Sequence, residues 1–287
     1  MRYNIRRQYI SYLAFGVLTV CLACTNQSID VDHNPIKILG HRGSGANYAS
    51  DFEANSFTSV KNALEKLHGA EVDVQCSKDS TIWLYHDADL PENEIGLVCI
   101  PSSTDSELIE MDNHDSNYSF TKLEDIFILM TQMESKPLLS LDVKGYFPNG
   151  CFDKASAPHS YFITFAHSLS SLLNKYNLHE NVLVETDYQY FLDVIRNTEP
   201  SVECYLLGYS DFESKVEVAV NKSYHGVSYR YSSDDLSFKA IKQAQQKGLK
   251  IMLWAIYAKE DFEQIYSWNP NLIQIGNIDM ASSYIDN

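Results

Sequence analysis

Basic residues are scarce in this chain of 287 residues. Lysine and arginine together number 22, against 38 aspartates and glutamates, so the formal net charge is −16. An acidic surface of this kind argues against binding to nucleic acid and to anionic lipid headgroups. We therefore expect no nucleic-acid partner, and no feature of the sequence indicates an obligate protein partner.

Cysteine pairs with metal-binding spacing are missing from the body of the chain. Cys76, Cys99, Cys151 and Cys204 show no Cys-x-x-Cys spacing, which argues against a zinc site. An oxidising compartment would permit disulfides, but four cysteines allow three full pairings and the sequence does not choose among them. We expect buried free thiols.

A long apolar run is also missing, and the longest candidate lies near the N-terminus. Three arginines precede an apolar stretch from about Tyr9 to Ala23, which is too short for a transmembrane helix and is typical of a signal peptide over 1–23. The sequence Cys21-Leu-Ala-Cys24 resembles a bacterial lipobox. We expect cleavage before Cys24, a lipid on Cys24 and a polar tether over 24–35.

This prediction implies an exported protein, a periplasmic or outer-membrane lipoprotein of a Gram-negative bacterium, held at the membrane through its lipid anchor. An ordinary signal peptide and an uncleaved anchor are the alternatives.

Repeats and low-complexity tracts are absent, and the rest of the chain alternates between strand-length apolar runs and helical patterns. The alternation predicts parallel pairing through crossover helices, and eight strands suit closure into a (β/α)₈ TIM barrel over 36–287. The predicted strands lie near 36–40, 70–75, 137–143, 181–185, 203–207, 225–229, 250–255 and 272–275. The predicted helices lie near 56–67, 121–134, 160–176, 188–197, 211–220, 234–247 and 259–266.

One stretch after the second strand interrupts this alternation. Thr81–Tyr85 reads as a short extra strand, and residues 91–118 are polar and contain two prolines. We interpret 91–118 as a small insertion in the barrel.

Chemically active side chains gather between residues 39 and 90. Glu71 and Asp73 lie two apart in a strand, so both carboxylates face one side and suit a hard cation such as Ca²⁺ or Mg²⁺. His41 and His86 each follow an apolar run, and two histidines can share the roles of general base and general acid. Arg42 offers a planar fork of donors that matches phosphate oxygens.

These motifs, taken together, resemble the glycerophosphodiester phosphodiesterase domain. That family carries His-Arg-Gly, Pro-Glu-Asn-Thr, Gly-Ala-Asp-x-x-Glu-x-Asp-Val, Thr-Lys-Asp-Gly and His-Asp-x-x-Leu. This chain has Leu39-Gly-His-Arg-Gly, Gly69-Ala-Glu-Val-Asp-Val and Tyr85-His-Asp-Ala-Asp-Leu. The resemblance is dense over 36–90 and continues more thinly to the C-terminus.

The resemblance implies roles for further residues. Asp142 and Lys144 stand in the third barrel strand where the family has Glu-x-Lys, so Asp142 becomes the third metal ligand with Glu71 and Asp73, and Lys144 lies near the phosphate. An ion pair at the barrel mouth is the alternative for Asp142 and Lys144. Trp254 matches the family's tryptophan in the seventh strand, where it would pack on substrate or belong to the core.

Two segments depart from the family pattern. Phe52-Glu53-Ala54-Asn55-Ser56 replaces Pro-Glu-Asn-Thr, with one residue inserted before the asparagine; we expect Glu53 to reach the substrate. The fourth strand ends in Glu185, which could contact substrate hydroxyls or a metal-bound water.

The function that the resemblance implies is metal-dependent hydrolysis of glycerophosphodiesters to glycerol 3-phosphate and an alcohol. His41 and His86 would be the catalytic pair, Arg42, Lys144, Glu53 and Trp254 would bind substrate, and one divalent cation, Ca²⁺ or Mg²⁺, would be the cofactor. Two alternatives stay open: a weakly catalytic or non-catalytic lipoprotein that binds phosphodiester headgroups, and a phospholipase C of the phosphatidylinositol type.

Overall fold

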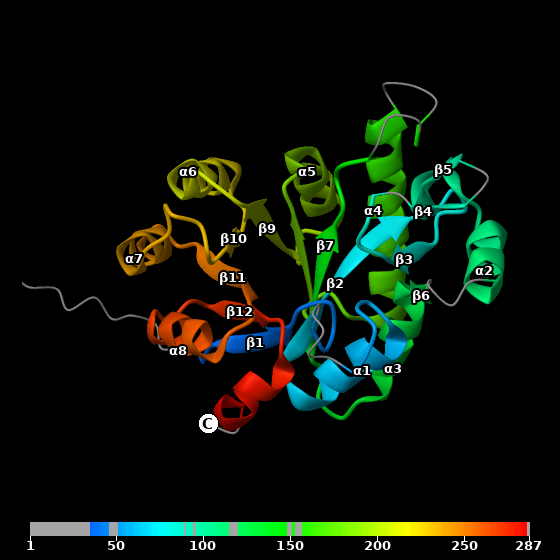
Figure 1. Cartoon of the computed structure of the whole chain (residues 1–287). Helices are drawn as coiled ribbons and strands as arrows, with labels where there is room; N and C mark the ends of the chain where they lie inside the picture. Colours follow the sequence, from blue (N-terminus) through cyan, green and yellow to red (C-terminus); the bar gives the residue numbers. More distant parts are fainter. Residues whose placement is uncertain are drawn as a thin grey trace, which may run out of the picture. The chain divides into compact units, whose positions relative to one another are not determined.

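A parallel eight-stranded barrel forms the centre of the molecule (Figure 1). The computed structural model describes residues 35–45, 51–88, 90–93, 96–114, 120–147, 151–152 and 157–285. The barrel strands are β1 (Lys37–Gly40), β2 (Gly69–Cys76), β7 (Leu138–Val143), β8 (Val182–Thr186), β9 (Glu203–Gly208), β10 (Gly226–Arg230), β11 (Lys250–Ile256) and β12 (Leu272–Ile275). All eight strands were expected from the apolar runs.

Closure depends on β1, which pairs with strands from both ends of the sequence. Lys37 of β1 stands opposite Leu272 of β12, and Leu39 stands opposite Gly69 of β2. Each of the other barrel strands pairs in parallel with the next one along the chain. Because parallel strands need crossover connections, the helices lie outside the barrel.

Those helices bury one apolar face each against the outside of the barrel. They are α1 (Phe57–Lys66), α3 (Leu123–Gln132), α4 (Ala157–Tyr176), α5 (Gln189–Thr198), α6 (Phe212–Lys222), α7 (Phe238–Gln246) and α8 (Lys259–Ser267), and a 3₁₀ helix, η2 (Ile278–Tyr284), follows β12. The side chains of Ser56 and Ser237 accept hydrogen bonds at the starts of α1 and α7, the role in which serine is favoured. None of the described helices is long and apolar enough to cross a membrane.

The inside of the barrel changes from apolar to polar along its axis. Leu39, Leu183, Tyr205, Met252 and Leu272 form an apolar cluster in the interior. The alternation of a strand then sends the side chains of Val72 and Val74 outward into the main core, while Glu71 and Asp73 face inward. The polar layer lies at the carboxyl ends of the strands, where barrel enzymes hold their active sites.

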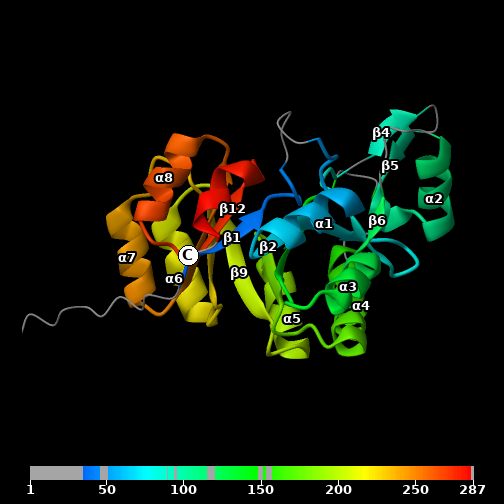
Figure 2. The ribbon, with the colours of Figure 1, turned by 90° about the horizontal axis from the view of Figure 1, so that it is seen from below.

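The predicted insertion has secondary structure of its own. Strand β3 (Ile82–Leu84) pairs antiparallel with β2, and β6 (Thr121–Lys122) pairs antiparallel with β3, so the two strands extend the sheet. Between them lie the hairpin β4 (Leu90–Asn93) and β5 (Gly96–Val98), η1 (Ile100–Ser102) and α2 (Asp105–His114). Trp83, Leu90, Ile100 and Leu108 form its small core. Figure 2 shows β4, β5 and α2 on the side of the barrel away from α7 and α8.

A disulfide between Cys99 and Cys151 joins the insertion to the segment that follows β7. The expectation of four free thiols is therefore wrong for this pair, and it is confirmed for Cys76 and Cys204, which are buried and free. The two bonded cysteines are 52 residues apart in sequence. They meet because β2 and β7 are neighbours in the barrel, which brings the segments after both strands to the same rim.

Candidate active site

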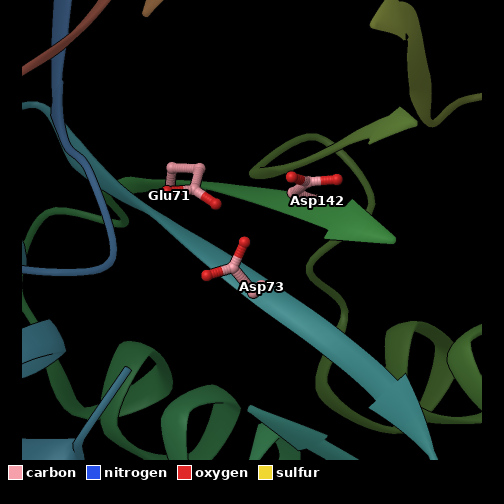
Figure 3. A group of neighbouring side chains, drawn as sticks. All are labelled: Glu71, Asp73 and Asp142. Atoms are coloured by element: carbon pink, nitrogen blue, oxygen red, sulfur yellow. The ribbon is translucent and has the colours of Figure 1, made fainter. Parts of the chain in front are cut away.

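Three inward-facing carboxyl groups on two neighbouring strands form the centre of the site (Figure 3). Asp73 of β2 stands opposite Asp142 of β7, so the two side chains lie next to each other on the inner face. Glu71 lies one inward-facing position earlier on β2. Each residue offers an oxygen, and these oxygens all lie within 4.8 Å of one another. Hard oxygen ligands at this spacing could hold a divalent cation.

The ammonium group of Lys144 bridges two of these carboxylates. Its Nζ lies 2.6 Å from Asp73 Oδ1 and 2.6 Å from Asp142 Oδ2. Burial alone would lower the pKa of Lys144, but Asp142 and Asp73 outweigh it and raise that pKa above its usual range. Burial likewise would raise the pKa of Asp73, but Lys144 and Arg42 hold it below its usual range. Lys144 is therefore charged and fixed at the base of the site.

A tight turn after β1 places Arg42 beside the carboxylates. Arg42 takes a left-handed backbone conformation (φ 54°), and its backbone N–H donates to Glu71 Oε2 at 2.8 Å. Its side-chain Nε lies 3.1 Å from Asp73 Oδ2. The next residue, Gly43, has φ 86°, and a Cβ there would lie 2.5 Å from the hydroxyl of Ser59 in α1. Only glycine permits so close an approach of the turn to the helix.

Asn55 holds Asp73 in place, a role that we did not assign from the sequence. Its Nδ2 donates to Asp73 Oδ2 at 2.8 Å, and its Oδ1 accepts from the backbone N–H of Asp73 at 3.0 Å. Asn55 has φ 61°, a conformation that asparagine tolerates better than most residues. The sequence signal for this role was the asparagine of the family's Pro-Glu-Asn-Thr pattern, which Asn55 matches after the inserted residue.

The two histidines occupy different environments. His41 is buried, with Nε2 3.8 Å from Glu71 Oε2, and burial together with the charge of Arg42 lowers its pKa to about 3. His86 lies on the rim with 41% of its side chain exposed, and its Nδ1 is 2.7 Å from Asp87 Oδ1. His41 is thus neutral near pH 7, while the exposed ring of His86 contacts a carboxylate.

Glu71 combines burial with an unsatisfied oxygen. Burial, followed by the charge of Asp73, raises the pKa of Glu71 well above its usual range. Its Oε1 is buried and has no hydrogen-bond partner among the described residues. A buried carboxyl oxygen without a partner is costly, so this atom is suited to a proton or a bound cation.

Glu185 sits deeper in the same cavity and receives three hydrogen bonds. Ser140 Oγ and Gln274 Nε2 donate to its Oε1 at 2.7 and 2.5 Å, and Ser228 Oγ donates to its Oε2 at 2.5 Å. Burial, followed by the charge of Asp142, raises the pKa of Glu185 to about 7. The carboxyl group therefore ties β7, β10 and β12 to β8 across the barrel.

Aromatic residues line the opposite part of the rim. Tyr209 follows β9 and packs edge-on against Trp254 of β11, with ring centroids 5.2 Å apart. The strand β11 shifts register after Leu253, and Ala255 there has φ 66°, a strained conformation for alanine that is typical of functional sites. Tyr257 packs edge-on against His41, with centroids 6.3 Å apart.

Comparison with protein families gives one match over most of the barrel. The model of the "Glycerophosphoryl diester phosphodiesterase family" matches residues 41–273. The chain belongs to this family. Its members are phosphoric diester hydrolases, and small-molecule glycerophosphodiesters are their substrates. No significant match was found among curated proteins.

Solved structures share the fold of this family member at low sequence identity. A Silicibacter pomeroyi protein assigned to the same activity has a TM-score of 0.73 and 13% identity, and the match covers 88% of this chain and 94% of that one. The glycerophosphodiester phosphodiesterase of Thermotoga maritima has a TM-score of 0.65 and 19% identity, with coverage of 88% and 99%. An Oleispira antarctica phosphodiesterase in complex with the product sn-glycerol-3-phosphate has a TM-score of 0.68 and 14% identity, with coverage of 88% and 97%.

Most of the residues that the sequence singled out line one cavity of about 290 Å³ in this family member. They are His41, Arg42, Glu71, Asp73, His86, Asp142, Lys144 and Trp254. The cavity also contains Glu185, the apolar Leu207 and four polar or aromatic residues that the sequence analysis did not name: Tyr209, Arg230, Tyr257 and Gln274. Each of the four is a single residue at or near a strand end, with no motif around it. Glu53 is exposed and is not among the lining residues, and Cys24 lies outside the described residues.

Proposed function

We propose that this protein hydrolyses glycerophosphodiesters to glycerol 3-phosphate and an alcohol, with one divalent cation as cofactor. The observation that carries the proposal is the convergence of two histidines, two basic side chains and three carboxylates on one cavity. Family membership supports the same reaction class. Phosphoryl transfer depends mainly on positioning and on neutralising charge, which this set of side chains can supply.

The carboxylates fit a calcium or magnesium ion. Glu71, Asp73 and Asp142 supply hard oxygen ligands within 4.8 Å of one another, and the unpartnered Oε1 of Glu71 gives a bound cation a buried acceptor. When bound, the cation would withdraw charge from the non-bridging phosphate oxygens.

The basic residues would hold the phosphate over this centre. Lys144 is fixed between Asp73 and Asp142, and the guanidinium of Arg42 is held by Asp73 with about a quarter of its side chain exposed. These ion pairs fix the positions of both side chains in the lining of the cavity. They would neutralise the charge that grows on phosphate oxygens as the new P–O bond forms.

The different settings of the histidines suggest separate roles. Neutral His41 would accept the proton of a glycerol hydroxyl as its oxygen attacks phosphorus. His86, whose Nδ1 lies 2.7 Å from Asp87 Oδ1, would protonate the departing alcohol oxygen as the old P–O bond breaks. The cyclic phosphate so formed is opened by water: His86 then takes a proton from the water, and His41 returns its proton to the glycerol oxygen.

Turnover of glycerophosphocholine, glycerophosphoethanolamine and glycerophosphoinositol tests the proposal. We expect release of alcohol and glycerol 3-phosphate, loss of activity with a chelator, and recovery with Ca²⁺ or Mg²⁺, whose affinities calorimetry would rank. His41→Ala and His86→Ala should each lower kcat by about 10²- to 10⁴-fold. Full activity in both variants would overturn the mechanism. Binding of these esters without turnover would favour a headgroup-binding protein, and activity on an intact phosphoinositide alone would favour a phospholipase C.

We also propose that the chain is exported and anchored by a lipid on Cys24. The arginine-rich start, the apolar stretch and Cys21-Leu-Ala-Cys24 support this. The wild-type protein should pellet with membranes, and Cys24→Ser should move it to the soluble fraction. An unchanged distribution in Cys24→Ser would contradict the lipid anchor.

A further inference from the structure

A second and larger cavity adjoins the catalytic one. It has a volume of about 1080 Å³ and runs from the ends of β9 and β10 along the space between α6 and α7; we call it the α6–α7 groove. The catalytic cavity is about 290 Å³. Ligand pockets for drug-sized molecules span roughly 300–1,000 Å³, so the groove has room for a group much larger than a phosphate with its glycerol.

Two residues line both cavities, so the cavities are neighbours. Tyr209 follows β9, and Arg230 ends β10. Arg230 stands opposite Trp254 of β11 in the sheet, and Tyr209 packs on Trp254. A phosphodiester held at Lys144 could therefore extend one of its two ester groups past these residues into the groove.

The junction between the cavities holds an unsatisfied donor. Nε1 of Trp254 is buried and forms no hydrogen bond with any described residue. A buried N–H without an acceptor is unfavourable. An oxygen-bearing ligand at this junction would remove that deficit, and Tyr209, half exposed, offers an aromatic surface beside it.

The groove itself mixes hydrogen-bond acceptors and donors. Its carboxylates Asp211 and Asp235 are used within the fold, by the backbone of Ser214 and by Tyr229. Four other lining residues are exposed and have no described hydrogen-bond or ion-pair partner: Glu213, Asp234, Gln243 and Gln246. Hydroxyl groups, which both donate and accept, match such a lining.

Charge narrows the class of ligand further. Four acidic residues against Arg230 and Lys247 make the groove unfavourable for an anion. Arg230 stands where the groove meets the catalytic cavity, so a cationic group attached directly to the phosphate ester would meet a like charge there. A neutral, polyhydroxylated group encounters neither penalty.

We propose that the α6–α7 groove binds the alcohol part of the substrate and selects a neutral polyhydroxylated group, such as inositol or a sugar. The inference rests on the proposed hydrolysis and adds its substrate class. It also places specificity on the side of the barrel away from the insertion, since Figures 1 and 2 both show α6 and α7 opposite β4, β5 and α2.

Steady-state kinetics with two esters test this subsite. The wild-type protein, with its cation, should show a kcat/KM for glycerophosphoinositol at least about tenfold above that for glycerophosphocholine, because inositol offers several hydroxyl groups to the groove and esterified choline offers none. Asp234→Ala and Gln243→Ala should each raise KM for glycerophosphoinositol about fivefold with kcat unchanged. Each should change KM for glycerophosphocholine less, because esterified choline has no hydroxyl group for either side chain.

Gln264→Ala is the matched control, since Gln264 is an exposed glutamine on a barrel helix, α8, away from the groove. It should change neither ester's constants. Equal rates on the two esters, a preference for the choline ester, or groove variants that behave like Gln264→Ala would each overturn the subsite and leave the proposed hydrolysis intact. If the wild-type protein hydrolyses no glycerophosphodiester, the proposed function fails and the subsite fails with it.

Discussion

The two halves of the barrel mouth satisfy their polar groups in different ways. On the side of β1, β2 and β7, the charged side chains are held by one another: Lys144 by two carboxylates, and Asp73 by Arg42 and Asn55. On the side of β9, β10 and β11, the rim has exposed Tyr209 and Arg230, and a Trp254 donor without a described partner.

This difference separates chemistry from recognition. Preorganised charges can stabilise a transition state without rearranging during the reaction, and the β1–β2–β7 side has that property. On the β9–β11 side, Tyr209 is exposed and the Trp254 N–H has no described partner, so both can bind a ligand, whereas the unpartnered Oε1 of Glu71 on the other side belongs to the proposed cation site. The catalytic half should therefore tolerate substitution poorly, while the other half should alter selectivity.

The largest effect is expected from Lys144→Met. It removes the charge that holds Asp73 and Asp142 and that would contact the phosphate, so kcat/KM should fall by about 10³-fold. The matched control is Lys175→Met, since exposed Lys175 pairs with Glu124 at 2.7 Å on the helical surface. Steady-state kinetics on both proteins, with circular dichroism for folding, checks the comparison. A folded Lys144→Met protein with near-normal kcat/KM would contradict the division between the halves.

A smaller effect is expected from Asn55→Ala. It leaves the backbone N–H and one oxygen of Asp73 without the amide, so unfolding should require about 1–3 kcal/mol less free energy and kcat should fall roughly tenfold. Asn177→Ala is the control, because Asn177 is exposed with φ 52° and lies outside the site. Asn177→Ala measures how much stability is lost when alanine replaces asparagine in a left-handed backbone conformation. If urea denaturation and kinetics showed equal losses of stability and of kcat in the two variants, Asn55 would not position Asp73.

The smallest effect is expected from Glu185→Gln, which should change how the free energy of unfolding depends on pH. The pKa of Glu185 is raised from 4.5 to about 7, so the folded protein holds a proton that the unfolded chain releases, and its contribution to stability is lost as pH rises from about 4.5 through 7. Urea denaturation with a chelator at pH 5 and 7.5 should show the wild type losing up to about 3 kcal/mol more than Glu185→Gln.

Glu203→Gln serves as the comparison for this pH effect. Burial alone would raise the pKa of Glu203, but Lys250 and Tyr205 outweigh it and lower that pKa. Its contribution is therefore lost as pH falls below the usual carboxyl range, and between pH 5 and 7.5 the variant should show the slope of the wild type. If the free energy of unfolding of Glu185→Gln also changed with pH as in the wild type, Glu185 would not titrate between pH 5 and 7.5.

Local patterns predicted much of the fold. The eight apolar runs lie within one or two residues of the barrel strands, since a strand buried on both faces reads as a continuous apolar segment. The secondary structure of the polar stretch 91–118 could not be predicted from periodicity. Its short hairpin and α2 depend on a small core around Trp83 and Leu108. The Cys99–Cys151 bond was not predictable, since pairing depends on distance in space.

The barrel strands and the types of side chain at their ends follow from the sequence, because the two-residue alternation of strands and the order of the motifs specify both. The sequence placed Glu71 and Asp73 on one face without the structure. Which groups meet across strands depends on the tertiary structure: Lys144 with Asp73, the amide of Asn55 with Asp73, and Tyr209 with Arg230 in the lining of both cavities. These contacts join residues far apart in the chain, and barrel closure alone sets their distances.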